Sequence, residues 1–174
     1  MSDCKYCDLI AKKSNNLYED ENVFVMLSPE PAVPGHVIVL PKKHAPIIEL
    51  CPDFVVGDMF KVAQKVQKSL FETIGAQGTN VLVQNGIVSG QKNIHAMIHV
   101  LPRFENDKLE LGWNPKPSTP EDLAKSESKI KEFTKNVGVF EKEKPKPIEV
   151  PKTPEVKSEK GKEDYRVKSL KRIP

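Results

Sequence analysis

The chain has 174 residues, and 24 Asp and Glu residues nearly balance 27 Lys and Arg residues, so the formal net charge is only +3. A balance this even gives no indication of a nucleic-acid partner. The longest apolar runs, such as HVIVL at 36–40, are too short to cross a bilayer, and the first residues, MSDCKYCD, contain no apolar signal segment. We therefore expect one folded domain with an appendage, located in the cytoplasm and without a membrane partner.

The order of the predicted elements indicates an α+β fold. Four segments rich in β-branched and aromatic residues are predicted strands, at 22–27, 36–40, 79–84 and 93–103. A proline-rich turn joins the first two, which could form a hairpin or a meander. Residues 53–74 repeat apolar side chains at helical spacing, and Gly75 follows as a stop signal. One long helix is predicted there.

The chain beyond the last strand is predicted to be an extension followed by a tail. A short helix is expected after Thr119, which can cap it, because proline follows at the first helical position. We set the domain at 1–137, with its C-terminal extension starting at about residue 104. Residues 138–174 are rich in Lys, Glu and Pro, and this composition predicts a disordered tail. Residues 165–174 could dock on the domain or on an unknown protein partner, or could form a solvated basic end.

The predicted strand at 93–103, NIHAMIHVLPR, carries the most unusual side chains. Because side chains alternate along a strand, His95, Met97 and His99 should share one face, while Ala96 and Ile98 point to the other. Two imidazoles therefore flank a thioether on the same face.

Cysteine and histidine spacing indicates a metal site. Cys4 and Cys7 form a Cys-x-x-Cys pair that could chelate one ion, and His44 and His95 could complete a tetrahedral structural zinc site. Two alternatives remain: a surface pair with unrelated histidines, and a redox pair of the thioredoxin type. The redox alternative is less expected, because no strand precedes the pair. We interpret Cys51 as structural or incidental.

A second group of polar side chains suggests a phosphate site. His36 and His99 could join Asn85, Ser89 and Gln91 in donating hydrogen bonds to one phosphate group. Each residue taken singly has a simpler explanation as a packing or surface residue. Their concentration around one predicted strand favours the functional interpretation.

Three segments in this order, PGHVIVLPKKH, NVLVQNGIVSGQ and HAMIHVLPR, resemble the histidine triad (HIT) superfamily of nucleotide-binding proteins. The likeness covers roughly residues 4–103, and it is to the prokaryotic branch that begins with Cys-x-x-Cys. The resemblance implies a five-stranded antiparallel sheet with one long helix. It further implies a homodimer with that helix at the subunit interface.

The resemblance also implies roles for individual residues. It supports a structural zinc at Cys4, Cys7, His44 and His95. It places four residues beside the phosphates of a bound nucleotide: Asn85, Ser89, Gln91 and His99. The family's middle histidine, which attacks the α-phosphorus, is replaced here by Met97. An acidic residue that the family uses at the ribose hydroxyls is replaced by Ser28, which can still bond one hydroxyl.

The methionine changes the expected mechanism. A thioether has no nitrogen lone pair with which to form a phosphoramidate, so Met97 cannot supply the covalent nucleophile. It could instead fill an irregular gap or contact a bound ligand. We expect a protein that binds a nucleotide or another phosphorylated small molecule without the covalent activity. The alternatives are an enzyme that uses His99 or His36 as acid or base, and an interaction module with a vestigial pocket.

Overall fold

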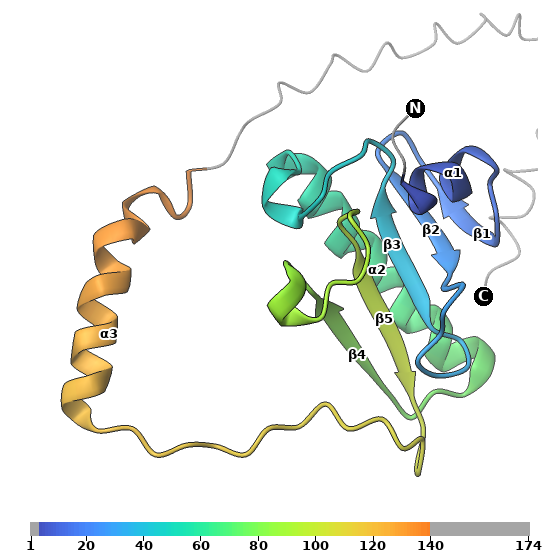
Figure 1. Ribbon diagram of the computed structural model, residues 1–174. Helices are drawn as coiled ribbons and strands as arrows, with labels where there is room; N and C mark the ends of the chain where they lie inside the picture. Colours follow the sequence, from blue (N-terminus) through green and yellow to red (C-terminus); the bar gives the residue numbers. More distant parts are fainter. Residues whose placement is uncertain (1–3, 140–174) are drawn as a thin grey trace, which may run out of the picture. The chain divides into compact units, whose positions relative to one another are not determined.

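The computed structural model describes residues 4–139, so the predicted docking segment at 165–174 lies outside the described residues. The strands in this part are β1 (Asn16–Glu19), β2 (Val23–Leu27), β3 (Val37–Pro41), β4 (Gly78–Val83) and β5 (Ile98–Arg103). All pair antiparallel, in the order β1-β2-β3-β5-β4 (Figure 1). The helices are α1 (Lys5–Ala11), α2 (Asp53–Ile74) and α3 (Pro120–Phe133), with short 3-10 turns at Ile48–Leu50, Ile87–Ser89 and Thr134–Asn136. The predicted α+β class and five-stranded antiparallel sheet are confirmed.

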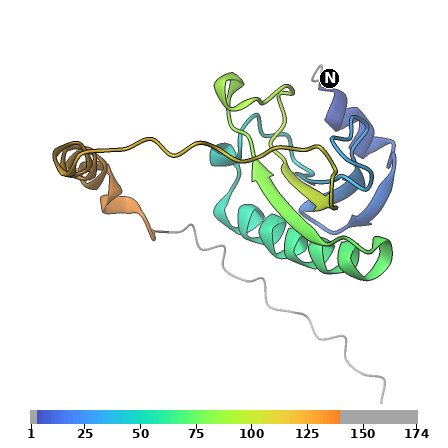
Figure 2. The same ribbon diagram turned by 90° about the horizontal axis from the view of Figure 1, so that it is seen from below.

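Helix α2 spans the predicted segment and covers one face of the sheet (Figure 2). It ends where Gly75 takes a left-handed conformation at φ +66, a conformation that glycine adopts at little cost. Its buried side chains are Val55, Met59, Ala63 and Leu70, and they pack on valines and isoleucine from β2, β3 and β5. This layer forms the larger part of the core.

The opposite face of the sheet carries a second, smaller core. Phe24 and Met26 of β2 alternate with the residues that face α2, as do Ile38 and Leu40 of β3. Tyr6 of α1 packs on them and is only 3% exposed. Helix α1 is thereby fixed on the face of the sheet where His99 lies, opposite α2 (Figure 2).

Strand β5 is shorter than predicted, because it begins at Ile98 and not at residue 93. The preceding backbone bonds to a loop instead: the Ala96 N–H donates to the Ala45 carbonyl at 2.6 Å. The alternation of sides nevertheless persists, since Ala96 packs with Ala45 and Cys51 while Met97 packs in the α1 core.

Helix α3 begins as predicted at its Thr119 cap. The Asp122 N–H donates to Thr119 Oγ1 at 3.1 Å, which satisfies one of the free amides of the first turn. No residue of α3 is buried, and its apolar residues Leu123, Ile130 and Phe133 are all exposed. Within residues 4–139, no helix combines the length and apolar character needed to cross a membrane.

Candidate functional site

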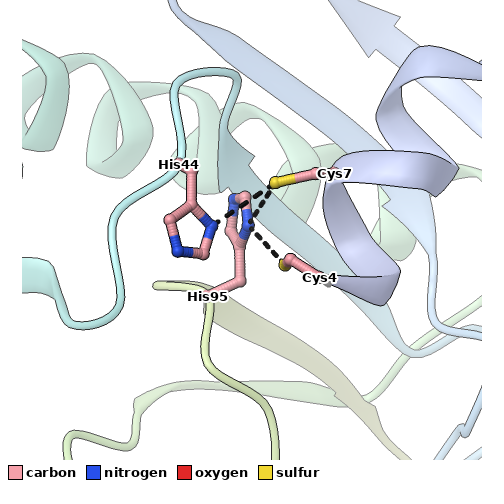
Figure 3. Close-up of side chains that lie close together, drawn as sticks. All are labelled: Cys4, Cys7, His44 and His95. Carbon is pink, nitrogen blue, oxygen red and sulfur yellow. Dashed lines mark hydrogen bonds between the residues drawn. The ribbon is translucent and has the colours of Figure 1, made fainter. Parts of the chain in front are cut away.

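Four possible metal ligands gather at one point of the fold (Figure 3). They are Cys4, Cys7, His44 and His95, and their ligand atoms all lie within 4.8 Å of one another. Cys7 Sγ lies 3.4 Å from His44 Nδ1 and 3.7 Å from His95 Nδ1. Cys4 Sγ lies 3.5 Å from His95 Nδ1. The two histidines therefore lie beside the Cys-x-x-Cys pair in the fold.

Three parts of the chain supply these side chains. Cys4 is the N-cap of α1 and Cys7 lies in its first turn, and a spacing of three residues puts both thiols on one side of the helix. His44 follows β3 and His95 precedes β5, and these two strands are neighbours in the sheet. The sheet thus fixes the two histidines, and packing of Tyr6 fixes the two cysteines.

The cluster fits a tetrahedral metal ion. Sulfur and nitrogen ligands bound to Zn²⁺ at about 2.0–2.3 Å lie about 3.3–3.8 Å from one another in tetrahedral geometry. The three separations given above lie within that range, and the others are at most 4.8 Å. Two thiolates with two imidazoles make a ligand set that Zn²⁺ favours. These four residues could hold a metal.

The ring of His95 is prepared for such a role. Its Nε2–H donates to the Pro41 carbonyl at 3.0 Å, which leaves the lone pair on Nδ1 facing the two sulfur atoms. The side chain is fully buried, and burial lowers its pKa. His95 is therefore neutral at neutral pH, as a metal ligand must be.

A cavity of about 300 Å³ is lined by Tyr6, which directly precedes Cys7, and by Met97, which lies two residues after His95. Both residues belong to the α1 core and also line the cavity. The other lining residues are Ser28, Glu30, Ala32, His36, Leu82, Gln84, Gly90, Gln91, Lys92, Asn93, His99, Leu101, Leu109 and Leu111. Its volume lies at the lower end of the range for small-molecule sites, and the wall is mostly apolar with a few polar groups.

Two histidines in this cavity form a hydrogen-bonded pair whose tautomers can be assigned. The Ala32 N–H donates to His36 Nδ1 at 3.1 Å, so the proton of the neutral His36 ring lies on Nε2. That Nε2–H donates to His99 Nδ1 at 3.0 Å, which leaves the His99 proton on its own Nε2. Among the described residues, no group forms a hydrogen bond with His99 Nε2. This atom is also accessible, since no buried side-chain nitrogen in that part of the chain lacks a partner. The pair therefore offers one N–H donor to the cavity.

Both histidines of the pair are neutral at neutral pH. Burial, with a smaller contribution from the neighbouring His99, lowers the pKa of His36 from 6.5 to about 4. Burial also lowers the pKa of His99. The pair supplies hydrogen bonding to a ligand but no positive charge.

Met97 lies on the wall of the cavity together with this pair. Its side chain is 8% exposed and packs in the α1 core with Tyr6 and Leu40. It therefore fills the core and also faces the cavity, and contact of Met97 with a bound ligand stays a prediction. No nucleophilic nitrogen is present at this position.

The predicted phosphate donors in the 85–91 loop have a different arrangement. Gln91 lines the cavity, whereas Asn85 and Ser89 are not among the lining residues. Asn85 Nδ2 donates to Glu49 Oε1 at 2.7 Å, and Ser89 Oγ donates to the Asn85 carbonyl at 2.6 Å. Gln91 Nε2 donates to the carbonyls of Pro46 and Asn93 at 2.7 and 2.9 Å. These donors hold the loop, and the phosphate role of the three residues remains a prediction.

Ser28 also lines the cavity, next to a residue that was not predicted. Ser28 Oγ accepts from the Glu30 N–H at 3.2 Å, and the Glu30 carboxylate forms an ion pair with Lys5 of α1. Lys92 is a further unpredicted lining residue. Nothing in the sequence near Glu30 or Lys92 distinguishes them from surface charges, because their place in the wall depends on tertiary contacts.

Comparisons with known proteins agree with this geometry. The HIT domain family matches residues 11–106. Adenylylsulfatase HINT3 from Arabidopsis thaliana is 34% identical over 110 residues, covering 62% of this chain and 56% of the plant protein. A crystal structure of a HIT family member from Bacillus subtilis is 28% identical with a TM-score of 0.70, covering 75% of this chain and 96% of that one. A zinc-bound histidine triad family protein from Mycobacterium smegmatis is 28% identical with a TM-score of 0.59, covering 73% and 97%.

The chain belongs to the HIT domain family, because the family match covers more than half of its length and includes most of the sheet, α2 and the histidine pair. The matched segment spans little more than half of the plant relative, so the activity of that whole protein does not follow from the match. The family and its relatives support a nucleotide-related function.

Proposed function

We propose that this HIT-domain protein binds a nucleotide or another phosphorylated small molecule in the cavity around His36 and His99, without a covalent nucleotidyl-histidine intermediate. The observation that carries the proposal is Met97 on the cavity wall beside an intact histidine pair. The pair keeps one N–H donor available for an anionic oxygen. The thioether beside it cannot form a phosphoramidate.

The apolar wall also favours a ligand with a nonpolar body. Leu82, Leu101, Leu109 and Leu111 line the cavity together with Tyr6. A nucleobase would bury apolar surface against such a wall, while its phosphate reaches the polar groups. Ser28 lies in the same cavity and carries a hydroxyl suited to a ribose hydroxyl.

A structural zinc ion at Cys4, Cys7, His44 and His95 belongs to the same proposal. The ligand separations and the Pro41 hydrogen bond to His95 support it. A zinc-bound relative of known structure supports it further. The ion would fix α1 against the segment that leads into β5, and so hold Tyr6 and Met97 in the cavity wall. Homodimer formation and a cytoplasmic location remain predictions.

One observation favours a second candidate, an enzyme that acts without a covalent intermediate. The Nε2 atom of His99 faces the cavity, and its N–H can stabilise negative charge on a leaving group. A donor placed in this way assists direct attack by water. Turnover separates this candidate from the binding protein.

Binding is tested by calorimetry and thermal denaturation with adenosine, AMP, ADP and a dinucleoside polyphosphate. A ligand at a hundred times its Kd should raise the free energy of unfolding by about 2.7 kcal/mol. His99→Ala should weaken AMP binding at least tenfold, because it removes the one donor of the pair that faces the cavity. Lys65→Gln, which removes an exposed charge on α2, is the control. Failure of every nucleotide to bind the native chain would overturn the proposal.

A further inference from the structure

The side chains of the 84–91 loop have few donors left to bind an anion. The donors of Asn85, Ser89 and Gln91 are all engaged within the protein. Gln84 Nε2 likewise donates to the Ser89 carbonyl at 2.9 Å. A phosphate that enters the cavity must therefore find other donors or displace these bonds at a cost.

The histidine pair supplies one free donor but no charge. His99 keeps its Nε2–H available, and both rings of the pair are neutral at neutral pH. A neutral donor alone compensates a phosphate dianion poorly, since charge-assisted bonds are roughly twice as strong as neutral ones. A positive charge has to come from another lining residue.

Two formally charged side chains line the cavity, Glu30 and Lys92. The Glu30 carboxylate is already paired with Lys5 across the rim, and this partner lowers its pKa. Lys92 is exposed and acts on Glu30 only through a weaker electrostatic effect. The charges of Lys5 and Glu30 cancel, so the positive charge of Lys92 is the one left to meet an anion in the cavity.

We infer that Lys92 and the His99 Nε2–H form the anion-binding subsite of this cavity, and that Lys92 selects ligands with a phosphate or sulfate group. This inference rests on the proposed function, which it makes more specific. The ammonium group supplies the charge, and His99 supplies a fixed direction for one oxygen. Lys92 is thus a specificity-determining residue next to Gln91, in a loop whose amide and hydroxyl donors bond to carbonyl and carboxylate oxygens of the protein.

The test compares AMP with its uncharged isostere, 5′-O-sulfamoyladenosine, by isothermal titration calorimetry on four proteins. They are the native chain, Lys92→Gln, Lys92→Arg and the control Lys65→Gln, which removes a charge from an exposed position on α2. Lys92→Gln should weaken AMP binding about tenfold and change binding of the isostere less than about twofold. Lys92→Arg should stay within about threefold of the native chain. The dependence of AMP affinity on salt should also become shallower in Lys92→Gln.

The outcomes separate this inference from the proposed function. If the native chain binds AMP and Lys92→Gln binds it as tightly as Lys65→Gln does, the Lys92 subsite is wrong while nucleotide binding stands. An equal loss for AMP and for the uncharged isostere would also overturn the charge-based selection. If the native chain binds neither compound and no other nucleotide of the series above, the proposed function fails, and the inference fails with it.

Discussion

The loss of a single metal ligand should release α1 from the sheet. In Cys7→Ser, one of the two sulfur ligands is replaced by a hydroxyl, a much poorer ligand for zinc. Helix α1 has only seven residues, and a helix this short does not persist in water without tertiary contacts. Without the ion, it is held by its packing on the sheet and by the exposed ion pair between Lys5 and Glu30.

The size of the effect follows from what α1 buries. Tyr6 is 3% exposed, and Leu9 and Ile10 are partly buried against the same core. Full burial of a large side chain is worth about 1.5–3 kcal/mol and partial burial about half of that, so release of α1 costs about 3–5 kcal/mol. A domain of this size loses about 2–4 °C of Tm per kcal/mol, which predicts a fall of about 6–20 °C.

The assay combines zinc content per chain with thermal denaturation by circular dichroism. Native protein should hold about one zinc per chain. Cys7→Ser should lose the metal, and its Tm should fall by the amount given above. His44→Ala should reproduce this result, because His44 is exposed and its removal leaves no cavity. Cys51→Ala, at the cysteine outside the cluster, should keep the metal. A Cys7→Ser protein with native Tm, or native protein free of metal after careful purification, would refute the reasoning.

Three further predictions concern stability. The pKa of His36 is lowered to about 4, so between pH 6.5 and about 4 the unfolded chain binds more protons than the folded chain. The free energy of unfolding should therefore fall by about 3 kcal/mol as the pH decreases through that window. Urea denaturation of His36→Gln should show a smaller fall. Gly35→Ala should lower the free energy of unfolding by about 1–3 kcal/mol, since φ is +82 and the new Cβ would lie 2.7 Å from Ile74 Cδ1. Gly57→Ala, whose new Cβ meets no atom within 4 Å, should instead raise it by about 0.5–1 kcal/mol. Deletion of residues 140–174, whose composition predicts disorder, should change Tm and AMP affinity little, and a large loss of Tm would instead indicate that the end of the chain docks on the domain.

The long helix could be predicted from the sequence with its ends, because the signals at both ends are local. A proline precedes Asp53, and Gly75 follows Ile74. Helix α1 and strand β1 were not predicted, since seven and four residues are too few for a periodic pattern to stand out. The strand predicted at 93–103 was too long by five residues. Side chains alternate between two faces in residues 93–97 as in a strand, but the Ala96 N–H bonds to the Ala45 carbonyl in a loop and not to a neighbouring strand.

The metal cluster was predictable for a chemical reason, and much of the cavity was not. Cysteine and histidine are rare, so four of them at suggestive positions could be grouped before the fold was known, and the fold brings these four together. Tyr6, Glu30 and Lys92 resemble ordinary core or surface residues in the sequence. They reach the cavity only because α1 and the loops before β3 and β5 meet there.

The absence of a covalent nucleophile is tested most directly by single-turnover phosphorus NMR on native protein and on Met97→His, with adenosine 5′-phosphoramidate and a dinucleoside polyphosphate as substrates. Native protein should bind both compounds without turnover, and the variant should release AMP from them. Turnover by the native chain that His99→Ala abolishes would contradict this account and would identify an enzyme with a non-covalent mechanism.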